Sequence, residues 1–470
     1  MNGAAKGLAL EALAPERLAF AGAPGEPVVL ERLSGSERAA PPARPTVVAR
    51  PQGRDGILDG AVFLFLQGPA SPFGHRLAQA LSARGGRIEK VHLCGGDVMF
   101  WPSRARLYRG ALADWPDYVE RLLSEAGVTD LVLFGDCRPY HVPAIAAARA
   151  RGIRLHLLEE GYVRPGRITC ESRGVNAHSD LPRQPEEVRA QAAHLPEPLE
   201  PAPVPEPFAP RALWDVRWHL GYFLLAPLFP RYRRHTLIHP ARDYAGWVWR
   251  WLGSSAAARR DRAARARIAG GGAYFLFPLQ LEGDFQMRVH SDFRSVEEVA
   301  RTVLGSFARH APDGVRLVVK RHPYDTSIPA SRRMIARLAR ELGLDGRVIF
   351  IEDGDVEPLV AGCAGVVLVN STTAMLALKH GRPLKVLGRA TYDMEGLSHQ
   401  GSLDDFWRAG AAPDAALVGA YRRLVIARTQ LPGGFFAPQA IATAVDVLVA
   451  RMATSEVEAL AALPAREARP

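Results

Sequence analysis

An acidic pair follows a hydrophobic run in the first third of the chain. Ile153–Leu158 has the composition of a buried strand, and Glu159-Glu160-Gly161 comes directly after it. Adjacent carboxylates repel each other, so at least one is expected to lie in a cleft, where it can act as a base or as a nucleophile. The alternative is a pair of surface glutamates at the start of a loop.

A histidine follows a second hydrophobic run. Val315–Lys320 is typical of a strand and delivers Arg321, His322 and Pro323. The proline disfavours helix at the preceding residue, so the imidazole is expected to point into a cleft. With Lys320 and Arg321 beside it, His322 would form a compact cationic site for a phosphate. The alternative is a structural histidine in a loop.

A run of small polar residues lies between a strand and a helix. Asn370-Ser371-Thr372-Thr373 follows the strand-like Val366–Val369 and precedes a helical pattern. It offers an N-cap, free backbone N–H groups and hydroxyls, which suit a phosphate at a helix N-terminus. The alternative is simple helix capping.

Three further strand ends carry weaker signals. The loops at Gln67-Gly68 and Gly95-Gly96-Asp97 contain glycines that permit close approach of the backbone to a ligand. Neither loop has the dinucleotide-binding or Walker spacing. Gln280 follows another strand and offers an amide contact to a ligand.

The elements that position these residues alternate between strands and helices. This spacing predicts βαβ units and parallel sheets, in two series separated by a composition break. Such folds bind ligands at the carboxyl ends of strands, in the crevice between halves. We therefore predict an α/β protein with a GT-B-like fold, in which two doubly wound Rossmann-type halves face a central cleft. The expected strands are 61–66, 88–93, 130–134, 153–158, 274–277, 315–320, 348–351, 366–369 and 384–387.

The composition breaks predict five segments. The first is rich in Ala, Pro, Gly and Arg, and the third combines a proline-dense stretch with a Trp- and Arg-rich helical stretch. They are a poorly ordered extension (1–58), an N-terminal acceptor-side domain (59–194), a linker with a helical segment (195–269), a C-terminal CMP-sugar-binding domain (270–430) and a helical tail (431–470).

The charge of the chain favours anionic partners. The 470 residues carry a formal net charge of +10, with an isoelectric point near 9.7. The alternative source of the excess is a GC-rich genome that favours arginine. The segment 214–267 is either a hydrophobic face with cations for a membrane surface or an ordinary core helix with solvated arginines. Nucleic-acid binding is not expected, because no helix-turn-helix, RNP or zinc pattern accompanies the charge.

Cysteine usage and hydropathy bear on the compartment. The four cysteines form no CxxC pair, so we expect buried free thiols in a reducing cytoplasm and no metal site. The N-terminus lacks the pattern of a secretory signal, and no run of about 18 apolar residues occurs. A soluble or peripheral protein is therefore expected. The cysteines are Cys94, Cys137, Cys170 and Cys363.

Taken in order, the motifs resemble the KpsS/LipB-type capsular polysaccharide biosynthesis and export proteins. The resemblance covers roughly residues 60–430. It is carried by QGPASPFGHRLAQAL (67–81), HLCGGDVMFW (92–101), LEEGYVRP (158–165), GVNAHS (174–179), FPLQLEGDFQMRVHS (277–291), VVKRHP (318–323), VNSTTAMLAL (369–378) and GRPLKVLGRATYDMEGLSHQGSLDDFW (381–407).

The resemblance implies a β-Kdo glycosyltransferase that uses CMP-Kdo to start a Kdo linker on a lysophosphatidylglycerol acceptor. It also implies a cytoplasmic protein of a Gram-negative bacterium, peripheral at the inner membrane. The implied partners there are a companion Kdo-extending transferase and the capsule ABC exporter. No cofactor or metal is implied beyond the donor substrate.

The motifs also match elements of related CMP-sugar transferases. Glu159-Glu160-Gly161 matches their acidic element and His322-Pro323 their HP element, which places His322 at the CMP phosphate. Resemblance implies retention at the anomeric centre, which a carboxylate nucleophile achieves most simply. Glu160 is the first choice for this nucleophile and Glu159 the second. The expected donor-binding residues are Lys320, His322, Pro323, Gln280, Asn370, Ser371 and Thr372, and those on the acceptor side are Gln67, Gly68, Gly95, Gly96 and Asp97.

Two alternative functions stay open from the sequence. One is a non-catalytic polysaccharide-export scaffold protein, which would not need the acidic and HP elements at strand ends in opposite halves. The other is a transferase that uses another CMP-nonulosonate, such as CMP-sialic acid.

Overall fold

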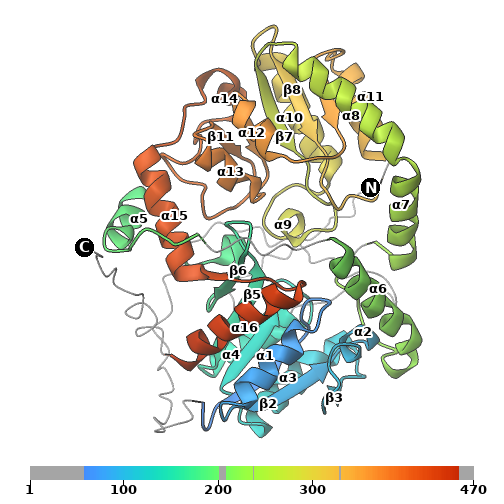
Figure 1. Cartoon of the computed structure of the whole chain (residues 1–470), viewed down its shortest axis with the longest axis vertical. Coiled ribbons are helices and arrows are strands. Elements are labelled where there is room, and N and C mark those ends of the chain that lie inside the picture. The colour runs from blue at the N-terminus through green and yellow to red at the C-terminus, as the bar shows by residue number, and fades with distance from the viewer. Residues whose placement is uncertain (1–57, 201–207, 237, 328–329, 455–470) are drawn as a thin grey trace, which may run out of the picture.

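A computed structural model describes residues 58–200, 208–236, 238–327 and 330–454 (Figure 1). Residues 1–57 of the predicted extension and residues 455–470 of the predicted tail lie outside the described residues. The described chain forms two α/β halves stacked along the long axis, with a helical segment along one side (Figure 1).

The N-terminal half is built on a seven-stranded sheet of order β12-β6-β5-β4-β1-β2-β3. The five strands from β1 to β5 run parallel, whereas β6 and β12 are antiparallel to their neighbours. The sequence predicted a wholly parallel sheet and missed β3, β6 and β12. The strands are β1 (Val62–Phe65), β2 (Arg87–His92), β3 (Arg106–Leu107), β4 (Asp130–Phe134), β5 (Arg154–Glu160), β6 (Arg167–Glu171) and β12 (Gln430–Pro432).

Helices cover both faces of this sheet because its strands are apolar on both sides. In β1, Val62 and Leu64 pack with Trp115 on one face, while Phe63 and Phe65 pack into the cluster on the other. The elements of this half are α1 (Phe73–Ser82), α2 (Gly95–Val98), η1 (Leu112–Asp114), α3 (Trp115–Glu125), α4 (His141–Ala150), η2 (Asn176–His178) and α5 (Pro185–Ala192).

The C-terminal half has a five-stranded parallel sheet of order β11-β10-β7-β8-β9. Its strands also alternate between two buried clusters, with Leu276 on one face and Phe277 on the other. The elements are β7 (Tyr274–Pro278), α9 (Phe285–Arg288), α10 (Val296–His310), β8 (Arg316–Lys320), α11 (Ala330–Glu341), β9 (Val348–Ile351), α12 (Glu357–Gly362), β10 (Gly365–Leu368), α13 (Thr373–Lys379), β11 (Leu384–Val386), α14 (Leu403–Ala409) and α15 (Ala415–Thr429).

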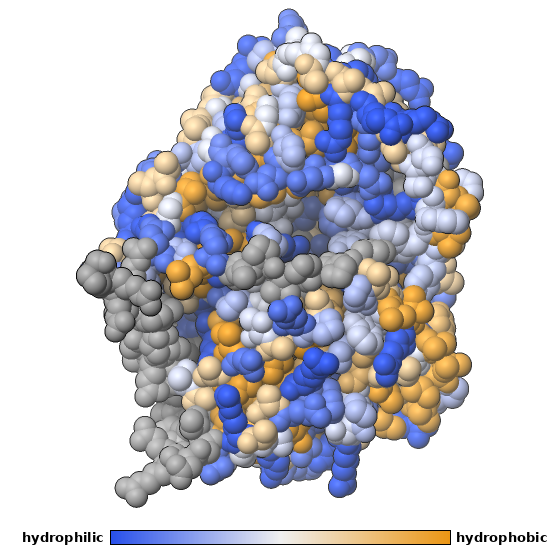
Figure 2. Space-filling model, in the orientation of Figure 1, coloured by the Kyte–Doolittle hydropathy of each residue, from blue (hydrophilic) through white to orange (hydrophobic). Residues whose placement is uncertain are grey.

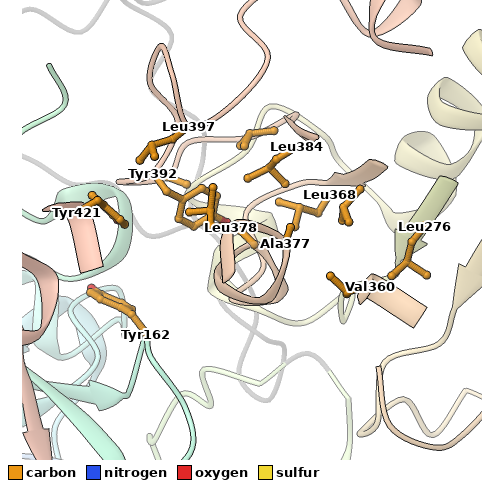
Figure 3. Packing of buried hydrophobic residues seen from close by; sticks show 14 of the residues in the cluster. Tyr162, Leu276, Val360, Leu368, Ala377, Leu378, Leu384, Tyr392, Leu397 and Tyr421 are labelled. Carbon is orange, nitrogen blue, oxygen red and sulfur yellow. The ribbon is translucent and has the colours of Figure 1, made fainter. Parts of the chain in front are cut away.

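Both halves therefore have the doubly wound arrangement, and the predicted GT-B-like α/β fold is confirmed. The core of the C-terminal half extends to the junction between them. Figure 3 shows Tyr162, which follows β5, beside Tyr421 of α15 at the edge of that core. The residues after the acidic pair are thus held against the opposite half.

The chain returns to the N-terminal half after α15. β12 adds to the edge of the first sheet, and α16 (Pro438–Ala453) packs against α1. Phe435 supports this contact, with its ring centroid 4.8 Å from that of Phe73. The predicted helical tail thus covers the N-terminal sheet as far as Ala453.

The linker segment bridges the two halves. It forms α6 (Phe208–Leu224), η3 (Ala226–Leu228), α7 (Pro240–Leu252) and α8 (Ser254–Ala269). α6 packs on α2 of the N-terminal half, α8 packs on β9 of the C-terminal half, and Tyr244 of α7 bonds Asp215 of α6 at 2.9 Å. Several large apolar side chains of α6 and α7 face outward, so the alternative of an ordinary core helix is wrong. Within the described residues, no helix is both long and apolar enough to span a bilayer.

Two local predictions are also corrected. Gly95-Gly96-Asp97, expected as a loop, forms the single helical turn α2, because the Asp97 carboxylate accepts from the N–H groups of Leu93 and Cys94. β5 does not end at Leu158 but continues through Glu160, because Glu159 and Glu160 pair with Thr169 and Ile168 of β6.

Candidate functional site

The carboxyl ends of the two sheets meet at the junction of the halves. Cys137, which follows β4, lies with its Sγ 3.7 Å from Nε2 of His290, which follows α9. Arg211 of α6 contacts Glu160 of the first half and also stacks on Tyr324 of the second, at 4.8 Å from the ring centroid. The predicted acidic and histidine elements therefore approach each other from opposite sides of the junction.

The strand conformation separates the two glutamates. Successive side chains of a strand point to opposite faces, so Glu159 and Glu160 have different surroundings. Glu159 points toward Gly135 of the neighbouring β4 end, and Glu160 toward Arg164 and Arg211. The two carboxylates are thus distinct chemical groups.

Glu160 is held by two arginines. Arg164 lies 3.2 Å from Oε2 and Arg211 lies 2.9 Å from Oε1. Burial alone would raise the pKa of Glu160, but Arg164, Arg211 and His322 together hold it below its ordinary value. Glu160 is consequently an ionised carboxylate at neutral pH, with His322 near enough to influence it.

Glu159 has the opposite character. Burial and the neighbouring charges of Glu160 and Asp284 raise its pKa to about 7, although the Glu160 N–H bonds Oε1 at 3.1 Å and Arg138 is nearby. A carboxyl group with a pKa near 7 can accept or release a proton at physiological pH. Glu159 is therefore suited to acid–base chemistry.

The glycine after the pair is needed for packing. A Cβ on Gly161 would lie 2.4 Å from the carbonyl oxygen of Arg167 in β6. The next N–H, of Tyr162, donates to Oε1 of Gln430 in β12 at 2.8 Å. The residues after Glu160 are therefore positioned by β6 and β12, two strands that the sequence did not predict.

His322 lies near Glu160 at the junction, as a neutral hydrogen-bond donor. The Tyr324 N–H donates to its Nδ1 at 3.1 Å, which leaves the proton of the neutral ring on Nε2. Burial lowers the pKa of His322 to about 4, with Arg164 and Lys320 adding to the effect against Asp325. His322, which was expected from the sequence to be part of a cationic site, is thus uncharged at neutral pH and can act as a hydrogen-bond donor.

The basic residues before His322 point into the protein. The Lys320 ammonium donates to the carbonyls of Arg321 and Glu352, and burial lowers its pKa to about 8. Arg321 is fully buried and pairs with Asp353 at 3.1 Å. The carbonyl of Pro323 accepts from Arg250 of α7. Of this element, His322 is the side chain placed near Glu160.

Gln280 and the Asn370 element come together in the second half. Gln280 Nε2 donates to Asn370 Oδ1 at 2.9 Å, and the Asn370 N–H donates back to Gln280 Oε1 at 3.1 Å. Ser371 Oγ accepts from the Thr373 N–H at 3.2 Å, whereas Thr372, the N-cap of α13, makes no side-chain capping bond. Asn370 and Thr372 also line a hollow of about 350 Å³, open solvent included, with Tyr162 and Asn176 of the first half. This element therefore borders the junction.

Gln67 organises a buried polar network in the first half. Its amide donates to Asp97 Oδ1 at 3.1 Å and to the Tyr232 hydroxyl at 3.2 Å. Arg138 donates to Gln67 Oε1 and to the carbonyl of Gly68, at 3.2 and 3.3 Å. The structure thus joins Gln67, Gly68 and Asp97, and adds Arg138, which influences Glu159.

Gly95 and Gly96 serve packing in this structure. A Cβ on Gly95 would lie 2.2 Å from the carbonyl oxygen of Gly221, and one on Gly96 would lie 2.3 Å from the Trp218 indole. The close approach that these glycines permit is therefore that of α6, where the sequence interpretation expected a ligand.

A hollow lies at the carboxyl end of β1, beside the Gln67 network. It encloses about 520 Å³, open solvent included, and its lining includes the aromatic rings of Trp101 and Trp218. Lys90 also lines it, with its ammonium 5.3 Å from the Trp101 ring centroid and bonded to the Leu66 carbonyl at 2.7 Å. A lysine among aromatic rings suits a ligand that is partly apolar and partly anionic.

A second polar cluster crosses the junction. Asp136 accepts from Nδ1 of His178 at 3.0 Å and from Sγ of Cys137 at 3.1 Å, and the His178 ring lies 4.6 Å from that of His290. Ligand atoms of these four residues lie within 4.8 Å of one another, and thiol, imidazole and carboxylate are zinc ligands. The cluster is thus the group of described residues with the chemistry to hold a metal. All four cysteines are buried and unpaired, as expected.

Several site residues were missed from the sequence. Arg164, His178 and His290 lie inside motifs that carry the family resemblance, so those motifs contained the signal. The sequence carried no signal for Arg211, because this residue lies in the linker, far along the chain from the glutamate it contacts. Only the folded arrangement of α6 reveals it.

The comparisons with known proteins agree on one family. Residues 129–436 match the family described as capsule polysaccharide biosynthesis protein. The capsule polysaccharide export protein KpsS of Escherichia coli is 35% identical over 81% of this chain and 98% of its own length. The capsule polysaccharide modification protein LipB of Neisseria meningitidis serogroup A is 34% identical over 79% of this chain and 91% of its own length.

One solved structure is also similar in overall arrangement. The Thermosulfurimonas dismutans KpsC β-Kdo 2,7 transferase matches with a TM-score of 0.41 and 13% identity, over 82% of this chain and 99% of that one.

Proposed function

The chain belongs to the capsule polysaccharide biosynthesis protein family, and on that premise we propose that it is a retaining β-Kdo glycosyltransferase. In this proposal it moves Kdo from CMP-Kdo to a lysophosphatidylglycerol acceptor and so starts the linker of a capsular polysaccharide. The observation that carries the proposal is the ionised Glu160 held at the junction near His322 of the opposite half.

In the first step, Glu160 is the nucleophile. One carboxylate oxygen forms a bond to the anomeric carbon of Kdo, the bond from that carbon to the phosphate oxygen breaks, and CMP leaves with the electron pair. The low pKa of Glu160 keeps the carboxylate ionised for this attack. Arg164 and Arg211 orient its two oxygens.

In the second step, Glu159 is the base. The acceptor hydroxyl attacks the same carbon, its proton passes to Glu159, and Glu160 is released, so that two inversions give retention. The pKa of Glu159, raised to about 7, suits this proton transfer. The different roles of the adjacent glutamates follow from their different environments.

The donor binds to the C-terminal half in this proposal. Nε2–H of His322 donates to the phosphate of CMP, and the Asn370, Ser371 and Thr372 element with Gln280 contributes further polar contacts. Hydrogen bonds from protein groups stabilise the charge that develops on the leaving phosphate, so the transfer is proposed to proceed without a metal. The acceptor binds to the N-terminal half, near Gln67, Gly68 and Asp97.

The proposed setting is the cytoplasmic face of the inner membrane, where the lipid acceptor lies. A companion Kdo-extending transferase and the capsule ABC exporter are the proposed pathway partners. The choice between donor sugars is the most specific part of the proposal, because CMP-Kdo and CMP-sialic acid present the same nucleotide to the same protein groups.

The test is a transfer assay with purified protein. CMP-Kdo and a lysophosphatidylglycerol analogue should give a product whose mass exceeds that of the acceptor by one Kdo residue, and anomeric NMR should show the β configuration. Product from CMP-sialic acid instead of CMP-Kdo would change the donor. No product from either donor would favour the non-catalytic scaffold.

A further inference from the structure

α6 and α7 expose large apolar side chains along one side of the molecule. Figure 2 shows this as hydrophobic colour over the part of the surface that α6 and α7 occupy in Figure 1. We define the α6–α7 face by its most exposed members, which have between 51 and 74% of their surface accessible. They are Leu213, Leu220 and Leu224 of α6 and Val248, Trp249, Trp251 and Leu252 of α7.

The exposed leucines of the α6–α7 face lie on one side of helix α6. Leu213, Leu220 and Leu224 recur at intervals of seven and four residues, which places them on one side of α6. The opposite side of α6 packs on the N-terminal half, where Trp218 and Gly221 contact α2. Because the inner side is already occupied, the outer apolar side is available for another partner.

The charge around this face is almost wholly positive. Residues 208–269 contain twelve arginines, three aspartates and no lysine or glutamate, a charge of +9 in a chain whose total is +10. The three aspartates are all bonded within the protein: Asp215 accepts from Tyr244, Asp243 accepts from Thr326, and the buried Asp261 accepts from the N–H of Glu352. Arg231, Arg242, Arg259 and Arg262 are exposed.

We propose that the α6–α7 face docks on the surface of a membrane that contains anionic phospholipid. Exposed leucines of α6 and exposed tryptophans and leucine of α7, with arginines around them, match the interfacial region and the phosphate layer of such a membrane. A protein partner would be expected to meet charges of both signs, whereas this segment carries twelve arginines against three aspartates that are all bonded within the protein. The proposal rests on the proposed function, which requires a lipid acceptor.

The docking face adjoins the functional site. Trp218, on the inner side of α6, lines the hollow beside Gln67, so α6 lies between the α6–α7 face and this hollow. α6 also carries Arg211, which contacts Glu160, and α7 supports the His322 loop through Arg250 and the carbonyl of Pro323. A lipid acceptor that leaves the membrane at α6 therefore arrives near the proposed catalytic carboxylates.

The experiment is vesicle co-sedimentation with the full chain. Wild type should bind phosphatidylcholine vesicles that contain phosphatidylglycerol at least about tenfold more tightly than phosphatidylcholine alone, since surface arginines each contribute about fivefold. The triple variant Trp249→Ser, Trp251→Ser and Leu252→Ser should lose most of this binding. Arg231→Ser with Arg242→Ser should reduce binding to the anionic vesicles selectively.

The matched control is Leu199→Ser, since Leu199 is 83% exposed but lies outside the face. This variant should bind as wild type does. Equal vesicle binding by wild type and the triple variant would overturn the proposal. It would also be overturned if wild type bound no vesicles but formed a dimer, and the triple variant were monomeric.

A second readout separates this proposal from the proposed function. Transfer to a short-chain, water-soluble acceptor should be unchanged in the triple variant, because the substituted side chains face outward. If transfer is absent in wild type while vesicle binding follows the pattern above, the enzyme proposal fails and the docking surface stands. Loss of soluble-acceptor transfer in a folded triple variant would contradict a purely membrane-docking role.

Discussion

The two halves share one strand order and differ in the groups at the ends of their strands. The order β3-β2-β1-β4-β5 in the first half corresponds to β9-β8-β7-β10-β11 in the second. The central strands β1 and β7 are both followed by a leucine and a glutamine, Leu66-Gln67 and Leu279-Gln280. Gln67 bonds Asp97 and Arg138, whereas Gln280 bonds Asn370.

This difference shows which chemical groups each half brings to the junction. The first half brings carboxylates to the junction, and the second brings a neutral histidine, amides and hydroxyls. In the proposed function, one half therefore supplies the nucleophile and the base, and the other half supplies hydrogen-bond donors for the phosphate. The proposed function needs both sets of groups, so substitutions in the first half should lower the rate of transfer and substitutions in the second half should weaken donor binding.

The largest effect is expected at Glu160. Glu160→Gln should lower kcat by at least about 10⁴-fold, because an amide cannot replace a nucleophilic carboxylate. CMP-Kdo affinity, measured by calorimetry, should stay near that of wild type. Glu186→Gln, at an exposed position of α5, is the control and should leave kcat unchanged. Wild-type turnover in Glu160→Gln would rule out Glu160 as the nucleophile.

Glu159 should give the next largest effect, with a dependence on pH. Because its pKa is about 7, the ionised base is present above that pH and is lost as pH falls. Wild-type kcat should therefore rise through about pH 7, and Glu159→Gln should lower it about 10²- to 10³-fold and abolish this limb. A Glu159→Gln profile with the wild-type limb intact would assign the base to another residue.

The second half should respond in donor affinity. His322→Ala removes the Nε2–H donor and should weaken CMP binding about tenfold to a hundredfold, as for a hydrogen bond to a charged group. His194→Ala, at an exposed position, serves as the control. Unchanged affinity for CMP in His322→Ala would take His322 out of the donor site.

Arg211 should give the smallest effect and links the two halves. Arg211→Ala removes a charge that lowers the pKa of Glu160, so that pKa should rise and the acid limb of kcat/KM should move to higher pH. At neutral pH the loss of rate should be about tenfold or less, because Arg164 remains. Arg259→Ala, on the exposed side of α8, should leave the profile in place.

The sequence predicted most of the parallel strands because each is a short apolar run between turn residues. β12 was missed because it pairs with β6, which lies far back along the chain. β6 was missed because it is a short strand that pairs with the neighbouring β5. Since β6 extends β5, the acidic pair was also wrongly expected after the strand, whereas it lies within β5. The different environments of Glu159 and Glu160, on which their proposed roles depend, follow from this strand and became visible only in the structure.

The candidate site shows the same limit. Glu160, His322 and Asn370 were found because polar residues after apolar strands gather at one edge of a parallel sheet. Arg211 and Tyr324 were not, because their roles depend on how α6 lies between the halves. The charge of His322 was likewise mispredicted, since neighbouring arginine and lysine side chains together with burial lower its pKa.

The most direct test of the account is the covalent intermediate. Full-length protein incubated with CMP-Kdo and no acceptor, then quenched in acid, should gain the mass of one Kdo residue. Peptide mapping should place this mass on Glu160, and later addition of acceptor before the quench should remove it. Glu160→Gln should show no gain. A Kdo residue mapped to Glu159 or elsewhere, or active protein that never carries one, would contradict the account.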